Sequence, residues 1–195
     1  MIAALILAAG QSRRMGQPKM PLAWGQRTVL GQVIHIFKAA DIEEVLVVTG
    51  GDKSLVEQIA EAGGARTAYN AEYATEEMLG SLQAGLRAMG PEVQAILMAL
   101  GDQPQMLENT VRLIVDVYAK RSLAVALIVP SYQMRRGHPW LVGRPLWDGI
   151  LAMRSPKTSR DFLHEHAQVI TYVDVDTPTI LQDVDTPEDY LKSRG

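Results

Sequence analysis

The chain has 195 residues, contains no cysteine and carries a formal net charge of −3 at pH 7. This length predicts one domain with a substantial core, and the absence of cysteine excludes disulfides, thiolate metal sites and cysteine nucleophiles, in keeping with a reducing cytoplasm. The net charge argues against nucleic acid or a membrane surface as a partner. No apolar run approaches the roughly 18 residues of a membrane span. The apolar N-terminal residues lack the basic region of a signal peptide, so we do not expect one.

Short apolar runs alternate with amphipathic segments along the whole chain. Residues 2–7 are aliphatic and too few for a helix, so they predict a buried strand. Thr28 is placed to cap a helix that carries Val29, Leu30, Val33, Ile34 and Phe37 on one face. The same patterns predict further strands at 45–48, 66–69, 95–100, 125–129 (ending at Pro130) and 169–175, and helices at 54–62, 77–89, 107–120, within 143–166 with a break at Ser155-Pro156, and after Thr186.

This alternation of strands and helices predicts a doubly wound, mostly parallel sheet in a three-layer α/β/α arrangement. Ligands of such sheets bind beyond the carboxyl ends of the strands. The segments 8–19 and 101–104 both follow predicted strands. We therefore expect residues 1 to about 104 to hold one substrate and residues from about 105 to 195 to hold a second, within a single domain.

Small residues, glycines and three cations follow the first predicted strand. Gly10 and Gly16 allow close approach of a ligand to backbone N–H groups, and Arg13, Arg14 and Lys19 add positive charge. The two glycines are one residue too far apart for a Walker A loop, and no G-x-G-x-x-G fingerprint is present. The segment thus suits a polyphosphate, and we expect a nucleotide.

Carboxylates mark two other segments. Asp102 follows the strand at 95–100 and suits either a Mg²⁺ site or a helix cap, two readings that the residues alone leave equal. Asp183 and Asp185 are spaced to share one side of an extended segment, where they suit either a second metal contact or a turn before the last helix, and for Asp189 we favour the cap of that helix.

Two polar groups of residues also leave alternatives open. Arg135 and Arg136, with Gly137 and His138, suit either a second phosphate or a solvated turn. Ser81, near the start of a predicted helix, suits either a ligand contact or a surface hydroxyl.

The segment from Leu7 to Lys19 resembles the signature L-A-[AG]-G-x-S-x-R-M-G-x-x-K of the MobA-like nucleotidyltransferases, which build molybdopterin dinucleotides. Its Ala-Ala-Gly resembles the molybdenum cofactor cytidylyltransferase branch (MocA-type). Further matches are L-x-D-x-P at 100–104, R-G-H-P at 136–139 after Pro130-Ser131-Tyr132, and D-[IV]-D-T-P-E-D-[YL] at 183–190, together with Asn70, Met78 and Ser81. The chain departs from the family at Glu77, where glycine is usual, and at 155–160, where only Arg160 of G-D-x-G-A-R is present.

The resemblance implies a Rossmann-like, GT-A-like nucleotidyltransferase fold and transfer of CMP from CTP to the phosphate of molybdopterin, with Mg²⁺ as cofactor. It implies the catalytic residues Arg14, Lys19 and Asp102 and the metal ligands Asp102 and Asp185. The implied nucleotide-binding residues are Leu7, Ala8, Ala9, Gly10, Ser12, Arg13, Arg14, Lys19, Asn70, Ser81 and Asp102, and the implied acceptor-binding residues are Arg136, Gly137, His138 and Pro139.

Two other functions are also compatible with these residues. One is a nucleotidyltransferase of the same fold that uses GTP or another acceptor, such as a sugar phosphate, an isoprenoid precursor or phospholactate; the choice between cytosine and guanine depends by resemblance on Ala9 and Gln103. The other is a non-catalytic nucleotide-binding or molybdenum cofactor delivery protein, which need not keep Lys19 and Asp102 together. A molybdoenzyme or its chaperone is the implied protein partner.

Overall fold

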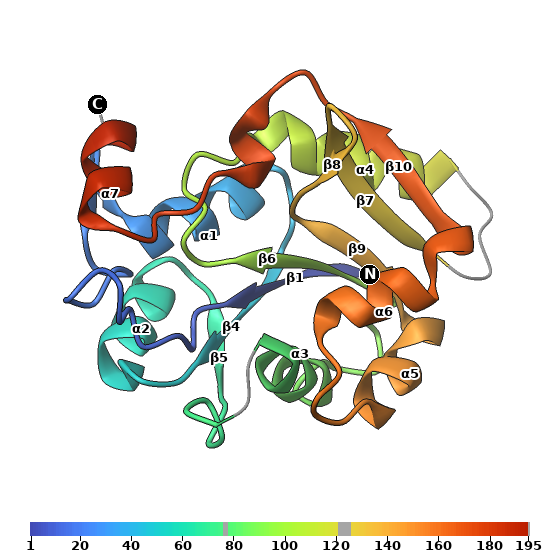
Figure 1. Ribbon diagram of the computed structural model, residues 1–195, viewed down its shortest axis with the longest axis horizontal. Coiled ribbons are helices and arrows are strands. Elements are labelled where there is room, and N and C mark those ends of the chain that lie inside the picture. The colour runs from blue at the N-terminus through green and yellow to red at the C-terminus, as the bar shows by residue number, and fades with distance from the viewer. Residues whose placement is uncertain (76–77, 121–125, 195) are drawn as a thin grey trace.

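A twisted sheet runs through the middle of the molecule (Figure 1). The computed structural model describes residues 1–75, 78–120 and 126–194. Seven strands follow one another across the sheet, and an eighth, β8 (Arg135–Arg136), pairs with β7. In spatial order the seven are β10 (Ile170–Asp174), β7 (Leu127–Tyr132), β9 (Trp140–Gly143), β6 (Ala95–Leu100), β1 (Ile2–Leu7), β4 (Glu44–Thr49) and β5 (Arg66–Tyr69).

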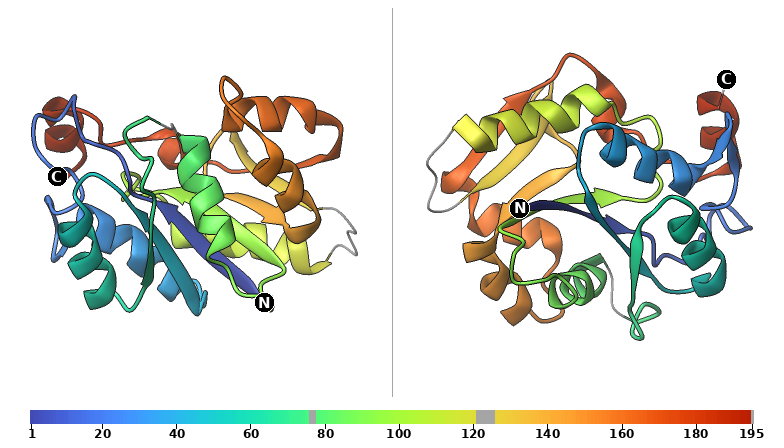
Figure 2. Two further views of the ribbon diagram at one scale, coloured as in Figure 1. Left: turned by 90° about the horizontal axis from the view of Figure 1, so that it is seen from below. Right: turned by 180° about the vertical axis from the view of Figure 1, so that it is seen from behind.

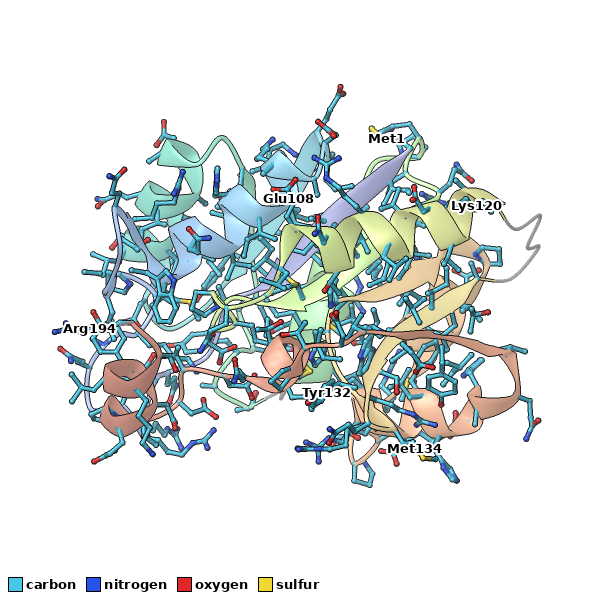
Figure 3. All side chains as sticks on the ribbon, turned by 90° about the horizontal axis from the view of Figure 1, so that it is seen from above. Met1, Glu108, Lys120, Tyr132, Met134 and Arg194 are labelled. Carbon is cyan, nitrogen blue, oxygen red and sulfur yellow. The ribbon has the colours of Figure 1, made fainter. Side chains whose placement is uncertain are left out.

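The sheet is mostly parallel, as predicted. Strands β1, β4, β5 and β6 run parallel, as do β7 and β10, whereas β9 is antiparallel to both of its neighbours. Leu7 at the end of β1 lies opposite Val48 on one side and Leu100 on the other. The segments that follow β1, β4 and β6 therefore leave the sheet at one level, on the side of Tyr132 and Met134 in Figure 3 and away from Met1.

Helices cover both faces of the sheet, which completes the predicted three layers (Figure 2). One face packs on α1 (Val29–Ala39), α2 (Lys53–Ala62) and α4 (Glu108–Lys120). The other packs on α3 (Met78–Arg87), α5 (Trp147–Ala152) and α6 (Ser159–Glu165). The strands bury residues on both sides because side chains alternate along them: Leu5 contributes to one cluster and Ile6 to the other.

Several helix ends follow from the sequence as expected. The Thr28 side chain accepts a hydrogen bond from the Gly31 N–H and caps α1. The final helix, α7 (Pro187–Ser193), begins with a capping box in which Thr186 and Asp189 exchange hydrogen bonds. The interpretation of Asp189 as a cap is thus confirmed. No helix among the described residues is both long and apolar enough to span a membrane.

Four short strands were not predicted, and one predicted boundary is wrong. The missed strands are β8, β9 and the hairpin of β2 (Ala23–Trp24) and β3 (Arg27–Thr28). Strand β7 does not end at Pro130 but continues to Tyr132. Its pairing with β9 stops at Ile128, so the proline lies beyond that ladder and beside β10, and its carbonyl accepts a hydrogen bond from the Gly137 N–H at 2.9 Å. Glu77 and Val125, the predicted starts of a helix and a strand, fall outside the described residues.

The end of the chain crosses the carboxyl edge of the sheet. Strand β10 lies at one side of the sheet, whereas α7 lies at the opposite side of the molecule (Figure 1), against strand β2. The Tyr190 hydroxyl donates to the Ala23 carbonyl at 2.6 Å, and the Tyr190 ring lies 6.5 Å from that of Trp24. The segment between β10 and α7, which carries Asp183 and Asp185, is consequently stretched past the ends of the central strands.

Candidate active site

A pocket of about 240 Å³ opens at the carboxyl ends of β1 and β6. It brings together residues from three segments that lie far apart in the sequence: 7–20, 73–81 and 100–102. Its lining is Leu7, Ala9, Gly10, Lys19, Met20, Tyr73, Met78, Ser81, Leu100 and Asp102. Six of the residues predicted to bind nucleotide, namely Leu7, Ala9, Gly10, Lys19, Ser81 and Asp102, therefore share one cavity.

The segment after β1 is held against the end of β4. The Ala8 N–H donates to the Val48 carbonyl at 3.0 Å, and the Gly51 N–H donates to the Ala9 carbonyl at 3.3 Å. A Cβ at Gly50 would lie 2.4 Å from the Ala9 carbonyl oxygen, so only glycine allows this approach. Gly10 itself is exposed and has no heavy atom within 4 Å of a built Cβ, which leaves its backbone accessible.

Ser12 directs the loop back toward the sheet. It has a positive φ of 50°, an uncommon conformation for a residue other than glycine. Its hydroxyl accepts a hydrogen bond from the Lys19 N–H at 3.2 Å, and its carbonyl accepts one from the Met15 N–H at 3.0 Å. These contacts fold residues 12–19 into a turn that returns Lys19 to the pocket.

Lys19 is at the centre of the polar contacts and is only 8% exposed. Its Nζ donates to Asp102 Oδ2 and, at 2.9 Å, to Asp185 Oδ1. Burial acts to lower the pKa of Lys19, but the two carboxylates outweigh it, and the pKa is raised above its ordinary value. The ammonium is thus a fixed positive charge at neutral pH.

Arg14 joins the same group from the solvent side. Its guanidinium lies 2.8 Å from Asp185 Oδ2, while 72% of its side chain is exposed. Arg13 instead turns to Gln11, whose Oε1 accepts from Nε at 2.8 Å. We refer to Arg14, Lys19, Asp102 and Asp185 as the Lys19 cluster; it joins the loop after β1, the end of β6 and the segment before α7.

Asp102 is not the cap of a helix, because α4 begins only at Glu108. One of its carboxylate oxygens is paired with Lys19. The other, Oδ1, is buried and has no hydrogen-bond partner among the described residues. A buried carboxylate oxygen without a donor fits a cation ligand. The described part of the chain holds no group of three or more histidine or carboxylate side chains that could hold a metal by themselves, and Mg²⁺ commonly combines one or two carboxylates with substrate phosphates and water.

Gln103 forms a contact that the sequence did not reveal. It is 2% exposed, and its Nε2 donates to Asp183 Oδ1 at 2.6 Å. Burial and the charge of Asp102 raise the pKa of Asp183, although the hydrogen bond from Gln103 acts in the opposite direction. The two partners are 80 positions apart, and no spacing rule could have linked them.

Asn70 and Ser81, both predicted to bind nucleotide, form a hydrogen bond with each other. The Asn70 Nδ2 donates to the Ser81 Oγ at 3.1 Å, and both residues are buried. The Asn70 Oδ1 accepts from the Glu72 N–H at 3.0 Å. Asn70 thus fixes the start of the segment that leads to α3 and holds Ser81 at the pocket wall.

The predicted acceptor residues Arg136, Gly137, His138 and Pro139, which we call the His138 block, lie on the other side of β6. The register of β9 places Trp140 opposite Met98, so His138 lies toward the carboxyl end of β6. The His138 ring stacks on Trp140 with centroids 4.9 Å apart, and its Nε2 is shielded and has no partner among the described residues. Burial, and to a smaller degree the charge of Arg160, lower the pKa of His138 to about 4.

The remaining members of the His138 block serve different purposes. Pro139 is buried, and Gly137 packs so tightly that a Cβ would lie 2.4 Å from the Ile180 carbonyl oxygen. Arg136 is exposed; its Nε donates to the Tyr172 hydroxyl at 2.9 Å. The reading of this block as a solvated turn therefore fits Arg136 but not His138, which is packed, neutral and short of one hydrogen bond.

Comparison with known proteins shows the family and the fold of the chain. The model of the MobA-like NTP transferase domain matches residues 4–169. The molybdenum cofactor cytidylyltransferase of Escherichia coli K12 is 27% identical over 99% of this chain and 95% of its own length. Among solved structures, Rv0371c of Mycobacterium tuberculosis H37Rv is 29% identical with a TM-score of 0.83, covering 98% of this chain and 96% of that one. A second structure of Rv0371c, in complex with manganese, is 28% identical with a TM-score of 0.77 over 98% of this chain and 96% of that one. The nucleotidyl transferase Mth528 of Methanothermobacter is 25% identical with a TM-score of 0.82 over 100% and 96% of the two chains.

Proposed function

The chain belongs to the MobA-like NTP transferase family, and on that premise we propose that it transfers CMP from CTP to the phosphate of molybdopterin and releases pyrophosphate. One observation carries the proposal: Lys19 and Asp102 meet in the pocket that Gly10 lines. A non-catalytic binding protein would have no need of this meeting. The likeness to the E. coli molybdenum cofactor cytidylyltransferase supports the choice of substrates.

The reaction exchanges one phosphate bond for another. An oxygen of the acceptor's phosphate monoester attacks the α-phosphorus of CTP, and the bond to the β-phosphate oxygen breaks. Since the second pKa of a phosphate monoester is about 6, the attacking oxygen is largely ionised at neutral pH and needs no strong general base. The barrier comes from repulsion between two anions and from charge on the leaving pyrophosphate, so positioning and positive charge supply the catalysis.

The Lys19 cluster provides that charge. In this proposal Lys19 faces the β- and γ-phosphates as a fixed ammonium, and Arg14 moves from Asp185 to the same phosphates. The move is easy for Arg14 because most of its side chain is in solvent. Leu7, Ala8, Ala9, Gly10, Ser12 and Arg13 form the loop around the phosphates, while Ser81, held by Asn70, belongs to the opposite wall.

A divalent cation fits the carboxylates of this site, and we assign it to Asp102 with Asp185. The unpartnered Oδ1 of Asp102 supports the assignment, as does the manganese complex of the mycobacterial relative. When bound, Mg²⁺ supplies positive charge that stabilises the triphosphate in the transition state.

We assign the acceptor to the His138 block and to the half of the domain after about residue 104, with the nucleotide in the half before it. His138 is neutral in this site, and its unpartnered Nε2 is suited to hydrogen bond with a pterin or its phosphate. Among the residues at 155–160, Arg160 is close enough to His138 to affect its pKa, and it adds a positive charge on the same side.

The test is incubation of the protein with Mg²⁺, molybdopterin and either CTP or GTP, with product masses and pyrophosphate measured. The proposal expects molybdopterin cytosine dinucleotide together with an equal amount of pyrophosphate. A guanine product would overturn the choice of base. Pyrophosphate release only with a sugar phosphate, an isoprenoid precursor or phospholactate would overturn the acceptor, and no release with any pair would indicate a nucleotide-binding or delivery protein.

A further inference from the structure

We infer that Gln103 and Asp183 form a partly buried clamp that positions Asp185 beside Asp102, and that Asp183 is a positioning residue rather than a metal ligand. The inference rests on the proposed function in taking Asp102 and Asp185 as the metal-binding carboxylates. It concerns residues 183 to 185, which lie between β10 and α7 and pass the carboxyl end of β6.

Two hydrogen bonds join this segment to the end of β6. Gln103 Nε2 donates to Asp183 Oδ1 at 2.6 Å, and the Val184 N–H donates to the Asp102 carbonyl at 2.8 Å. The Val184 side chain is fully buried. Backbone and side chain thus fix the same short stretch from both sides, and they fix it to the residues that flank and include Asp102.

The other bonds to this segment come from cations that the reaction needs elsewhere. Asp185 is held by Lys19 and Arg14. A triphosphate attracts both cations and weakens their hold on Asp185. The Gln103–Asp183 contact involves no cation, so it persists when the nucleotide arrives and keeps Asp185 close to Asp102 at the moment when both carboxylates are required.

The clamp also limits what Gln103 can do. Its amide nitrogen is engaged by Asp183, and the residue is 2% exposed. Its amide nitrogen is therefore not free to contact a nucleobase, and Gln103 is not among the residues that line the pocket. Any effect of Gln103 on the choice between cytosine and guanine acts through the position of the segment around Asp102.

Two substitutions at one position separate the roles of Asp183. Asp183→Asn keeps an oxygen that accepts from Gln103 but removes the charge, whereas Asp183→Leu has a similar shape and removes the acceptor. We expect Asp183→Asn to retain wild-type Mn²⁺ affinity in the presence of CTP, measured by electron paramagnetic resonance, within about twofold. We expect Asp183→Leu to weaken that affinity and to lower kcat by about 10–100-fold, the range found for residues that orient metal ligands, with little change in the KM for CTP.

Reversal of the hydrogen bond provides a rescue. Gln103→Glu places two carboxylates face to face and should impair Mn²⁺ binding as Asp183→Leu does. In the double variant with Asp183→Asn, the asparagine amide donates to the glutamate, and affinity should return to within about threefold of wild type. Glu188→Gln is the matched control, since it removes an exposed carboxylate of α7, the helix that follows this segment.

A measurement that does not depend on catalysis tests the Gln103–Asp183 clamp even if the protein uses another substrate. Amide hydrogen exchange at Val184 should be faster in Asp183→Leu and Gln103→Glu than in wild type, and restored in the double variant. Equal damage from Asp183→Asn and Asp183→Leu would make Asp183 a metal ligand, and unchanged exchange in both single variants would remove the clamp; either result overturns the inference. Absence of CTP binding by the wild type, with the expected exchange pattern, would instead count against the proposed function alone.

Discussion

Charged side chains hold the Lys19 cluster together, whereas in the His138 block the neutral His138 is held by ring stacking and Gly137 by close packing. The first kind of contact can exchange one partner for another, because each ion has its own affinity for phosphate or metal. The second kind keeps one geometry whatever is bound. In the proposed reaction this difference matches the two substrates: the triphosphate carries charge that must be neutralised, and the acceptor must be oriented for attack.

The largest effect is expected when the Lys19 cluster loses the carboxylate of Asp102, whose Oδ1 has no hydrogen-bond partner among the described residues. Asp102→Asn should lower kcat on the order of 10²–10³-fold, because charge stabilisation in the transition state is lost. Steady-state pyrophosphate release measures the effect. Asp116→Asn on α4, where the carboxylate is exposed, is the control. A kcat within twofold of wild type would show that Asp102 has no part in the chemistry.

Lys19→Ala should have the next largest effect, with kcat falling about 100-fold while CTP binding weakens only a few-fold. The reason is that the ammonium acts mainly on charge that develops as pyrophosphate leaves. Rapid-quench turnover and calorimetric titration with CTP measure the two quantities separately. Equal losses in turnover and in binding would mean that Lys19 contributes only to the ground state.

For the His138 block, the informative measurement is how the folding stability of the protein changes with pH. Because the pKa of His138 is about 4 in the folded protein, below the ordinary 6.5, the unfolded chain takes up a proton first as the pH falls. Stability should therefore decrease between pH 6.5 and 4, by about 2 kcal/mol once the partial exposure of the residue is allowed for. His138→Gln should remove this part of the slope in urea unfolding.

The exposed His164 provides the control for that measurement. His164→Gln should leave the decrease between pH 6.5 and 4 in place. If His138→Gln keeps the wild-type slope, the imidazole is not shielded as the structure has it.

Arg14→Gln should have the smallest effect on stability, under about 1 kcal/mol, because the pair with Asp185 is largely in solvent on the arginine side. It should nevertheless raise the KM for CTP several-fold, and more at low than at high ionic strength. Arg13→Gln is the matched comparison, since Arg13 binds only its neighbour Gln11 among the contacts described. If the two variants raise the KM equally, Arg14 has no specific role.

Much of the fold was predictable because long apolar runs record burial directly. The bounds of the buried strands β1 and β6 agree with the predictions at 2–7 and 95–100. Strand β5 also has its predicted bounds of 66–69, although its residues are mostly exposed. The two-residue strands β2, β3 and β8 could not be predicted, since no period is visible over so short a stretch. Strand β9 was missed although Gly137 and Pro139 precede it, because its four residues are too few to show a clear period, and Pro130 led to an early end for β7.

The candidate site was predictable residue by residue but not contact by contact. The types and spacing at Gly10, Lys19 and Asp102 indicated phosphate and metal chemistry, and the strand order indicated that they would meet. Spacing cannot reveal that Lys19 binds Asp185, 166 positions away, or that Gln103 binds Asp183. These two pairs form because the C-terminal segment passes the carboxyl ends of the central strands. Tertiary packing, not local sequence, determines that path.

That course of the chain has a consequence for biosynthesis. Every strand of the sheet precedes Asp185, so the ribosome completes the sheet before it adds this carboxylate. A nascent or prematurely terminated chain that lacks Asp185 can therefore have a folded core and still be unable to form the Lys19 cluster.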